Sequence, residues 1–190
     1  MKTKCTLRLM LVCCLIVFQT VATPANLDSH SLYQLELDLT DQDGTVSGLD
    51  VFKGQPVLIA MFYSSCPYAC PLTIQTLQKT EAALDPRTRG QLRVLLVSLD
   101  SEQDTPDKLA ELARHQKVDT ARWKLARTDA AGVRKLAAVL GIRFKRLPDG
   151  EFNHSTSINL LDRDGVQIMS SGRVGETDPA LLEKIKRVSG

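Results

Sequence analysis

The chain has 190 residues and a formal net charge of +2 at pH 7, with 24 basic and 22 acidic side chains. This balance gives no basic face of the kind that binds nucleic acid, and an aromatic content of 5% provides few rings for base stacking. We therefore expect no nucleic-acid partner, and the length suits one domain with a sizeable hydrophobic core.

The first 22 residues have the pattern of a secretory signal peptide. Three basic side chains in the first eight positions precede an apolar run over 9–18, and Thr20-Val21-Ala22 offers a cleavage point of small residues. The run is shorter than the roughly 20 residues of a membrane-spanning helix. We expect cleavage after Ala22, a polar tether over 23–31 and a folded domain over 32–190. The location is then periplasmic, with membrane association only if the leader stays attached.

Removal of the leader changes both charge and cysteine content. It contains three of the 24 basic residues and no acidic residue, so the net charge without it is −1. It also contains Cys5, Cys13 and Cys14, which leaves Cys66 and Cys70 as the cysteines of the mature chain. A single pair in an oxidising compartment is either a structural disulfide or a working dithiol.

Strands and helices alternate along the rest of the chain. Apolar and polar residues alternate over 33–39, which predicts a half-buried strand, and Asp41–Gly44 turns the chain into a short partner over 45–47. The continuous apolar run over 56–63 predicts a strand covered on both faces. The remaining predicted elements are a helix from Pro71 to a stop at Asp85-Pro86, a strand over 92–99, a helix over 105–117, a strand over 123–126, a helix over 129–140 stopped by Gly141, an extended segment at 142–144, a strand over 157–161, a turn over 162–165, a strand over 166–170 and a helix over 178–188. This order predicts an α/β sandwich with parallel central strands and an antiparallel C-terminal edge.

Cys66 and Cys70 lie where the apolar strand meets the next helix. Open α/β sheets place their sites at the carboxyl ends of such strands, and the partial positive charge of a helix N-terminus favours a thiolate. Residues i and i+4 on a helical turn lie about 5–6 Å apart at Cβ, whereas a disulfide needs roughly 3.5–4.5 Å. A small backbone adjustment would therefore switch between bridge and open thiols. A static disulfide is the plainer alternative, but closing so short a loop stabilises a fold little.

His154 is the histidine best placed to join this pair, because it comes just before the predicted strand over 157–161. Taken alone it is a weak signal, since a lone histidine is more often a surface or hydrogen-bonded residue. His30 lies in the tether, and His115 falls on the exposed side of a helix.

Together these motifs resemble the Sco/SenC family. They are Cys-x-x-x-Cys-Pro after an apolar strand, the run Leu96–Asp100 followed by Asp104-Thr105-Pro106, and a histidine 84 residues beyond Cys70 before a strand that ends in Asp-x-Asp-Gly. The resemblance covers about Leu32 to Val188. It implies a thioredoxin-like sandwich with an added N-terminal β-hairpin.

The resemblance also implies one copper ion per chain, as Cu(I) or Cu(II), held by Cys66, Cys70 and His154. Two thiolates and an imidazole form a soft set that suits Cu(I), and Cu(II) can be held when a further weak ligand joins. Structural zinc prefers four protein ligands, and no fourth cysteine or histidine is placed to serve. An aspartate or glutamate could supply the fourth ligand, so zinc remains an alternative to copper.

The sequence departs from the family pattern between the cysteines. The family often has an acidic residue there, as Cys-Pro-Asp-x-Cys, and this chain has Tyr68; Ser64-Ser65 replaces the common Thr-His. Less negative charge beside the thiolates should alter copper affinity and partner choice. The client could therefore differ from cytochrome c oxidase.

Two functions follow from the resemblance. One is a periplasmic copper-binding protein, a copper chaperone or redox assembly factor for a copper enzyme such as cytochrome c oxidase, without turnover as an enzyme. The other is a thioredoxin-like thiol–disulfide oxidoreductase, with Cys66 and Cys70 as the catalytic redox pair. The partner is accordingly a copper-receiving or a disulfide-bearing client, such as a subunit of the oxidase. His154 discriminates between the two functions, because a copper site needs all three residues, whereas dithiol exchange needs no third metal ligand.

Overall fold

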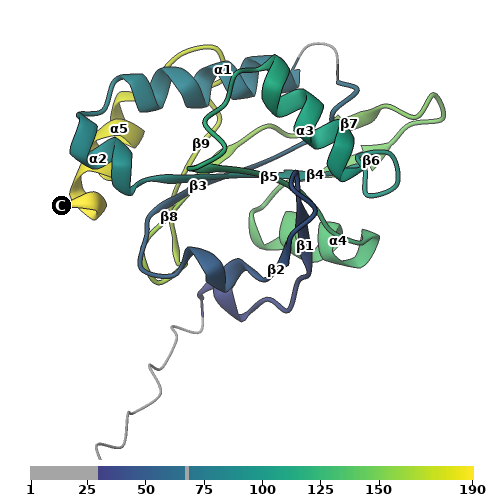
Figure 1. Cartoon of the computed structure of the whole chain (residues 1–190), viewed down its shortest axis with the longest axis horizontal. Helices are drawn as coiled ribbons and strands as arrows, with labels where there is room; N and C mark the ends of the chain where they lie inside the picture. The colour runs from purple at the N-terminus through teal and green to yellow at the C-terminus, as the bar shows by residue number, and fades with distance from the viewer. Residues whose placement is uncertain (1–29, 67–68) are drawn as a thin grey trace, which may run out of the picture.

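A mixed seven-stranded sheet forms the centre of the computed structural model, which describes residues 30–66 and 69–190 (Figure 1). The strands of this sheet, in the spatial order β2-β1-β5-β4-β3-β8-β9, are β1 (Leu39–Asp41), β2 (Val46–Ser47), β3 (Val57–Phe62), β4 (Arg93–Ser98), β5 (Trp123–Arg127), β8 (Ile158–Leu161) and β9 (Gln167–Ser171). A separate hairpin pairs β6 (Phe144–Arg146) with β7 (Phe152–His154). The helices are α1 (Ala69–Ala82), α2 (Pro86–Gln91), α3 (Pro106–His115), α4 (Ala130–Val139) and α5 (Pro179–Ser189), with 3₁₀ turns η1 (Leu32–Gln34) and η2 (Leu49–Phe52).

The directions of the strands confirm the predicted sheet. β3 runs parallel to β4 and β4 parallel to β5, whereas β8 and β9 add antiparallel strands at one edge. At the other edge the β1–β2 hairpin joins β5 in antiparallel pairing.

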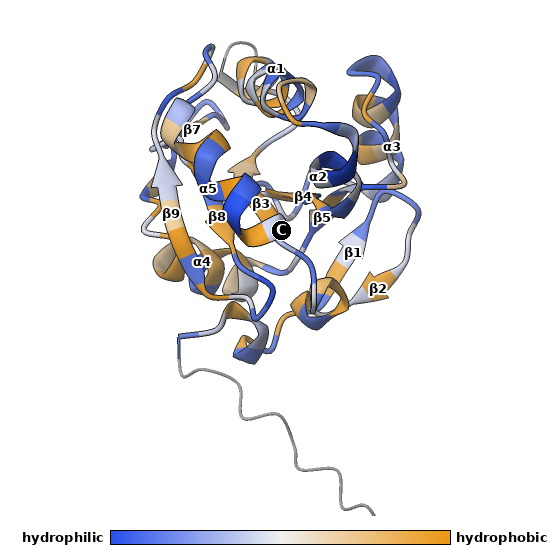
Figure 2. Ribbon diagram, turned by 90° about the vertical axis from the view of Figure 1, so that its left-hand side faces the viewer, coloured by the Kyte–Doolittle hydropathy of each residue, from blue (hydrophilic) through white to orange (hydrophobic). Residues whose placement is uncertain are grey.

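Helices cover both faces of the sheet, which explains the apolar run of β3. In Figure 1, α1, α3 and α5 lie above the sheet and α4 lies below it. All six residues of β3 are buried, and Figure 2 shows apolar residues concentrated on β3 and β8. Within the described ranges, no helix has both the length and the apolar composition needed to cross a membrane.

The strand predicted over 33–39 is wrong for most of its length. Leu32–Gln34 forms η1, and β1 begins only at Leu39. The Ser31 hydroxyl accepts a hydrogen bond from the Tyr33 amide and so caps η1, while the Leu32 amide donates to the Gly165 carbonyl (2.9 Å). Ser31, the last residue of the predicted tether, also bridges to Val166 and packs against the domain. Tertiary contacts with a distant turn therefore override the local alternation.

Gly165 makes this contact feasible. Its φ of +82° lies in the left-handed region that favours glycine. A Cβ at this position would come within 2.6 Å of the Tyr33 ring. The glycine thus serves both the turn between β8 and β9 and the close approach of η1.

Helix α2 was not predicted. Asp85-Pro86 does follow the end of α1, as expected for a stop signal. The same dipeptide also starts a new helix, because the Asp85 carboxylate accepts from the amides of Arg87 and Thr88 (3.0 and 3.1 Å) and Pro86 occupies the first turn.

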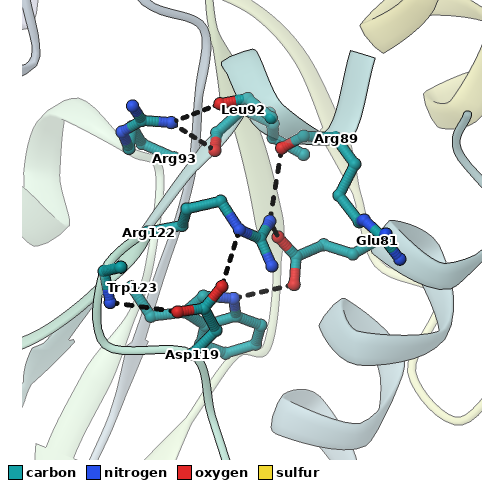
Figure 3. A network of polar contacts seen from close by, with 9 residues as sticks. Glu81, Arg89, Leu92, Arg93, Asp119, Arg122 and Trp123 are labelled. Carbon is teal, nitrogen blue, oxygen red and sulfur yellow. Dashed lines mark hydrogen bonds and ion pairs between the residues drawn. The ribbon is translucent and has the colours of Figure 1, made fainter. Parts of the chain in front are cut away.

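A buried polar network fastens α1 to the start of β5 (Figure 3). The Glu81 carboxylate accepts a hydrogen bond from the indole N–H of Trp123 (2.7 Å) and forms an ion pair with Arg122. Arg122 also pairs with Asp119 through Nε (2.9 Å). The Trp123 side chain is only 1% exposed, so its indole N–H depends on Glu81 for a partner.

The cap of α5 predicts a pH-dependent loss of stability. The Asp178 carboxylate accepts from the Ser171 hydroxyl (2.6 Å) and the Ala180 amide (2.9 Å), and the Ser171 bond foremost holds the pKa of Asp178 below its ordinary value of 3.8. We expect Asp178→Ala to lower the free energy of unfolding at pH 7 by about 1 kcal/mol, as for loss of an N-cap. Because the folded-state pKa is the lower one, the ionised side chain stabilises the fold above pH 3.8 and loses this effect as the pH falls through that pKa.

Urea unfolding at pH 7 and at progressively lower pH measures the difference in free energy of unfolding between the unaltered chain and Asp178→Ala. This difference should decrease in acid. Asp178→Asn is the control, since its amide oxygen can still accept from the Ala180 amide and its NH2 group can donate to the Ser171 hydroxyl, without titrating. If the loss of free energy of unfolding in Asp178→Ala increased as the pH falls, the pKa of Asp178 would not be lowered by folding.

Candidate functional site

The two cysteines lie together at the carboxyl end of β3, as predicted. The Cys66 amide donates to the Tyr63 carbonyl (3.2 Å), just past the strand, and Cys70 lies in the first turn of α1. Both side chains are buried, with exposed fractions of 8% and 4%. Tyr68, where the sequence departs from the family pattern, lies outside the described residues.

Cys66 and Cys70 are two thiols, not a disulfide, in this structure. Burial raises the pKa of the Cys70 thiol; the Tyr63 amide, which donates to Cys70 Sγ (3.4 Å), opposes the rise, and neighbouring Cys66 adds to it. The expectation that the helix N-terminus favours the thiolate is therefore wrong for Cys70 in the metal-free protein, because burial dominates. A soft metal ion that binds here must displace the thiol proton.

Tyr63 connects the cysteines to the β6–β7 hairpin. Its ring packs against Phe152 (centroids 5.2 Å apart) and meets the ring of His154 edge-on (5.8 Å). Its hydroxyl donates to Glu151 Oε2 at 2.6 Å. Burial and the bond to Glu151 raise the pKa of Tyr63, so the hydroxyl remains protonated as a donor.

His154 lies at the end of β7 and is half-buried. Its Nδ1 lies 3.1 Å from the Ser155 carbonyl oxygen. Across 30–66 and 69–190, no three side chains of the histidine, cysteine, aspartate or glutamate type converge closely enough to hold a metal ion. The structure thus brings His154 to Tyr63, the residue bonded to both cysteines, but does not close a three-ligand site. The proposed ligand set stays a prediction.

His115, which lies on helix α3, has no part in this site. His115 is exposed on α3, where it lies 3.9 Å from the Glu111 carboxylate.

Asp104 fixes the loop in front of the cysteines. Its carboxylate is 1% exposed and accepts from the Ser64 amide (3.0 Å), the Ser64 hydroxyl and the Ser98 hydroxyl (2.5 Å). These bonds join the loop that leaves β3 to the end of β4. The sequence motif contains Asp104, but its spacing alone does not reveal Ser64 as a partner.

The α/β sandwich with an added N-terminal hairpin has a thioredoxin-like fold, and the dithiol lies at its strand-to-helix junction. The SCO1/SenC family model matches residues 26–190, so the chain belongs to the SCO1/SenC family.

Individual relatives agree with this assignment. A putative copper-binding protein of Stutzerimonas stutzeri is 25% identical over 134 residues, which cover 68% of this chain and 64% of the relative. The chain thus spans just under two thirds of that protein. The structure of Bradyrhizobium japonicum ScoI with copper bound superposes with a TM-score of 0.67 at 25% identity, covering 80% of this chain and 96% of ScoI. A putative electron transfer protein from Aquifex aeolicus shares the fold, with a TM-score of 0.74 at 20% identity over 84% of this chain and 93% of its own.

Proposed function

We propose that this protein binds one copper ion through Cys66, Cys70 and His154, and serves as a copper chaperone or redox assembly factor for a copper enzyme such as cytochrome c oxidase. The observation that carries the proposal is the position of Tyr63, which hydrogen-bonds to both cysteines through its backbone and contacts His154 through its ring. The copper-bound relative ScoI and the copper-binding relative of Stutzerimonas stutzeri support the choice of metal.

The donor set fits copper as cargo. The two thiols supply soft sulfur ligands once deprotonated, and the imidazole adds a nitrogen that suits both oxidation states. His154 lies on a two-stranded hairpin outside the main sheet, so it can approach the cysteines without disturbing the sheet. Closure of the hairpin would complete the site.

Replacement of His154 tests the ligand set. We expect the reduced mature chain to bind one copper ion, and His154→Ala to weaken binding by at least about tenfold, because a ligand is lost. Competition against a copper chelator measures the affinity, and metal analysis measures the stoichiometry. His115→Ala is the matched control, since His115 is exposed on α3. Equal affinity of His154→Ala and the unaltered chain would exclude the three-ligand site.

A dithiol oxidoreductase is the second candidate. The observation that favours it is the pair of unbridged neighbouring thiols, whose interaction affects the pKa of Cys70. This function would leave thiol–disulfide exchange intact in His154→Ala, whereas both functions would fail without Cys66 or Cys70. Exchange rates with a small disulfide, measured beside copper affinity, separate the two.

The periplasmic location also belongs to this proposal. It rests on the pattern of residues 1–22, which lie outside the described residues. Mass spectrometry of the native protein should find an N-terminus near Thr23 in the periplasmic fraction. An intact N-terminus in the membrane fraction would instead indicate an anchored protein.

A further inference from the structure

The β6–β7 hairpin has few polar connections to the body of the protein, although Phe152 belongs to the buried apolar core and Phe144 packs against it. At its base, Ser155 and Arg143 hydrogen-bond to each other, which closes the hairpin without tying it to the sheet. The ion pair between Arg146 and Glu102 does reach the loop after β4 (3.0 Å), but the Glu102 side chain is 70% exposed. Exposed ion pairs of this kind contribute little to stability.

The contact between Tyr63 and Glu151 is different in kind. It is a short hydrogen bond of 2.6 Å from a buried tyrosine to a carboxylate, and it joins residues 88 positions apart. Hydrogen bonds to charged groups are stronger than neutral ones. Glu151 precedes Phe152 and His154, which both pack on the ring of the same tyrosine. The Tyr63 side chain therefore contacts two residues of β7 and the residue just before it.

We propose that the Tyr63–Glu151 hydrogen bond is a latch that holds the β6–β7 hairpin, and with it His154, beside the cysteines before the metal arrives. Tyr63 and Glu151 act as positioning residues, not as ligands. The inference rests on the proposed copper site. A hairpin held near its bound position loses less conformational freedom when His154 closes on a metal, so the latch strengthens binding.

Conservative variants isolate the latch from ordinary packing. Tyr63→Phe keeps the ring that contacts Phe152 and His154, and removes the hydroxyl, which interacts with the Cys66 side chain as well as with Glu151. The glutamate variants leave the interaction with Cys66 in place. Glu151→Ala removes the acceptor, whereas Glu151→Gln keeps an oxygen that can accept. Two variants serve as matched controls. Tyr33→Phe removes a buried hydroxyl that has no hydrogen-bond partner among the described residues, and Glu102→Ala removes the exposed ion pair of the same hairpin.

Hydrogen exchange of the metal-free protein tests the latch without copper. We expect the amides of residues 144–154 to exchange about tenfold faster in Tyr63→Phe and Glu151→Ala, as loss of a charge-assisted bond allows, and the central strand β3 to stay unchanged. Glu151→Gln should restore much of the protection, and both controls should match the unaltered chain. Unchanged exchange of the hairpin in Tyr63→Phe would overturn the latch, whether or not the protein binds copper.

Copper binding provides the second readout. Tyr63→Phe and Glu151→Ala should weaken the affinity by up to about tenfold, through faster release, with Glu151→Gln close to the unaltered chain. Unchanged or tighter binding in both variants would overturn the positioning role. Failure of the unaltered chain to bind copper would instead reject the proposed function, while the exchange measurement would still decide the latch.

Discussion

Oxidation of Cys66 and Cys70 to a disulfide should abolish tight copper binding, and reduction should restore it. Copper ligation requires thiolates, and a bridged pair offers none. Loss of two ligands out of three should weaken binding by at least about a hundredfold, because loss of a supporting contact alone costs about 10–100-fold. The two thiols lie at a junction that can bridge with a small change of backbone, so the oxidised form should keep the fold.

A chelator competition on one sample, first oxidised and then reduced, measures this effect. A shortened chain that begins at Thr23 is the appropriate material, since it contains no cysteine besides Cys66 and Cys70. A Cys66→Ser/Cys70→Ser variant should bind weakly under both conditions and reports any copper held elsewhere. Equally tight binding by the oxidised and reduced forms would show that the cysteines are not ligands.

Glu81→Ala should strongly destabilise the fold. It leaves the buried indole N–H of Trp123 without an acceptor and removes one carboxylate from Arg122. Breaking a buried pair and orphaning a buried donor together should lower the free energy of unfolding by about 3 kcal/mol. Because Arg122 retains Asp119 and some solvent contact, the cost should stay near the lower end of the range for buried pairs.

Urea unfolding of the unaltered chain and of two glutamate variants tests this expectation. Glu183→Ala is the matched control, since Glu183 pairs with Lys186 on the exposed face of α5 and should contribute little to the free energy of unfolding. Similar losses in Glu81→Ala and Glu183→Ala would mean that the network of Figure 3 does not stabilise the junction of α1 and β5.

Elements with local signals were predicted well from the sequence. Helices α3 and α4 begin after Thr105 and Asp129, whose side chains accept from backbone amides of the first turn. Strand β3 was recognisable from its continuous apolar run, since burial on both faces removes the alternation that an exposed face imposes. Such signals are contained within a few neighbouring residues.

Elements that depend on distant partners were missed. Residues 33–39 alternate in polarity, yet Tyr33 packs on a turn more than 130 residues away. The short strands of the β6–β7 hairpin combine charged and aromatic residues, so the pairing of Phe144 with His154 was missed, although Pro148-Asp149-Gly150 between them is a turn signal. The prediction of an extended segment at 142–144 therefore captured only part of one strand.

The residues of the candidate site also fall into those with a signal in the sequence and those that depend on a distant partner. Spacing alone singled out Cys66 and Cys70, and family resemblance added His154. The bond from Tyr63 to Glu151 connects residues 88 positions apart, and neither residue type indicates the other in a sequence. Contacts of this kind follow from the fold and become visible only in three dimensions.

The bridge between Ser31 and Val166 fixes the end of the sheet at which the chain enters the domain. Val166 follows the turn beyond Leu161, and Leu161 pairs with Val57 at the start of β3, whereas the thiols follow the end of that strand. The chain therefore enters the domain about 20 Å from the cysteines, at the opposite pole, given the rise of six strand residues. Figure 1 shows this entry below the sheet. A tag, fusion or solid support attached ahead of Ser31 would therefore join the domain at the end of the sheet away from the cysteines, and would leave the cysteine end unobstructed.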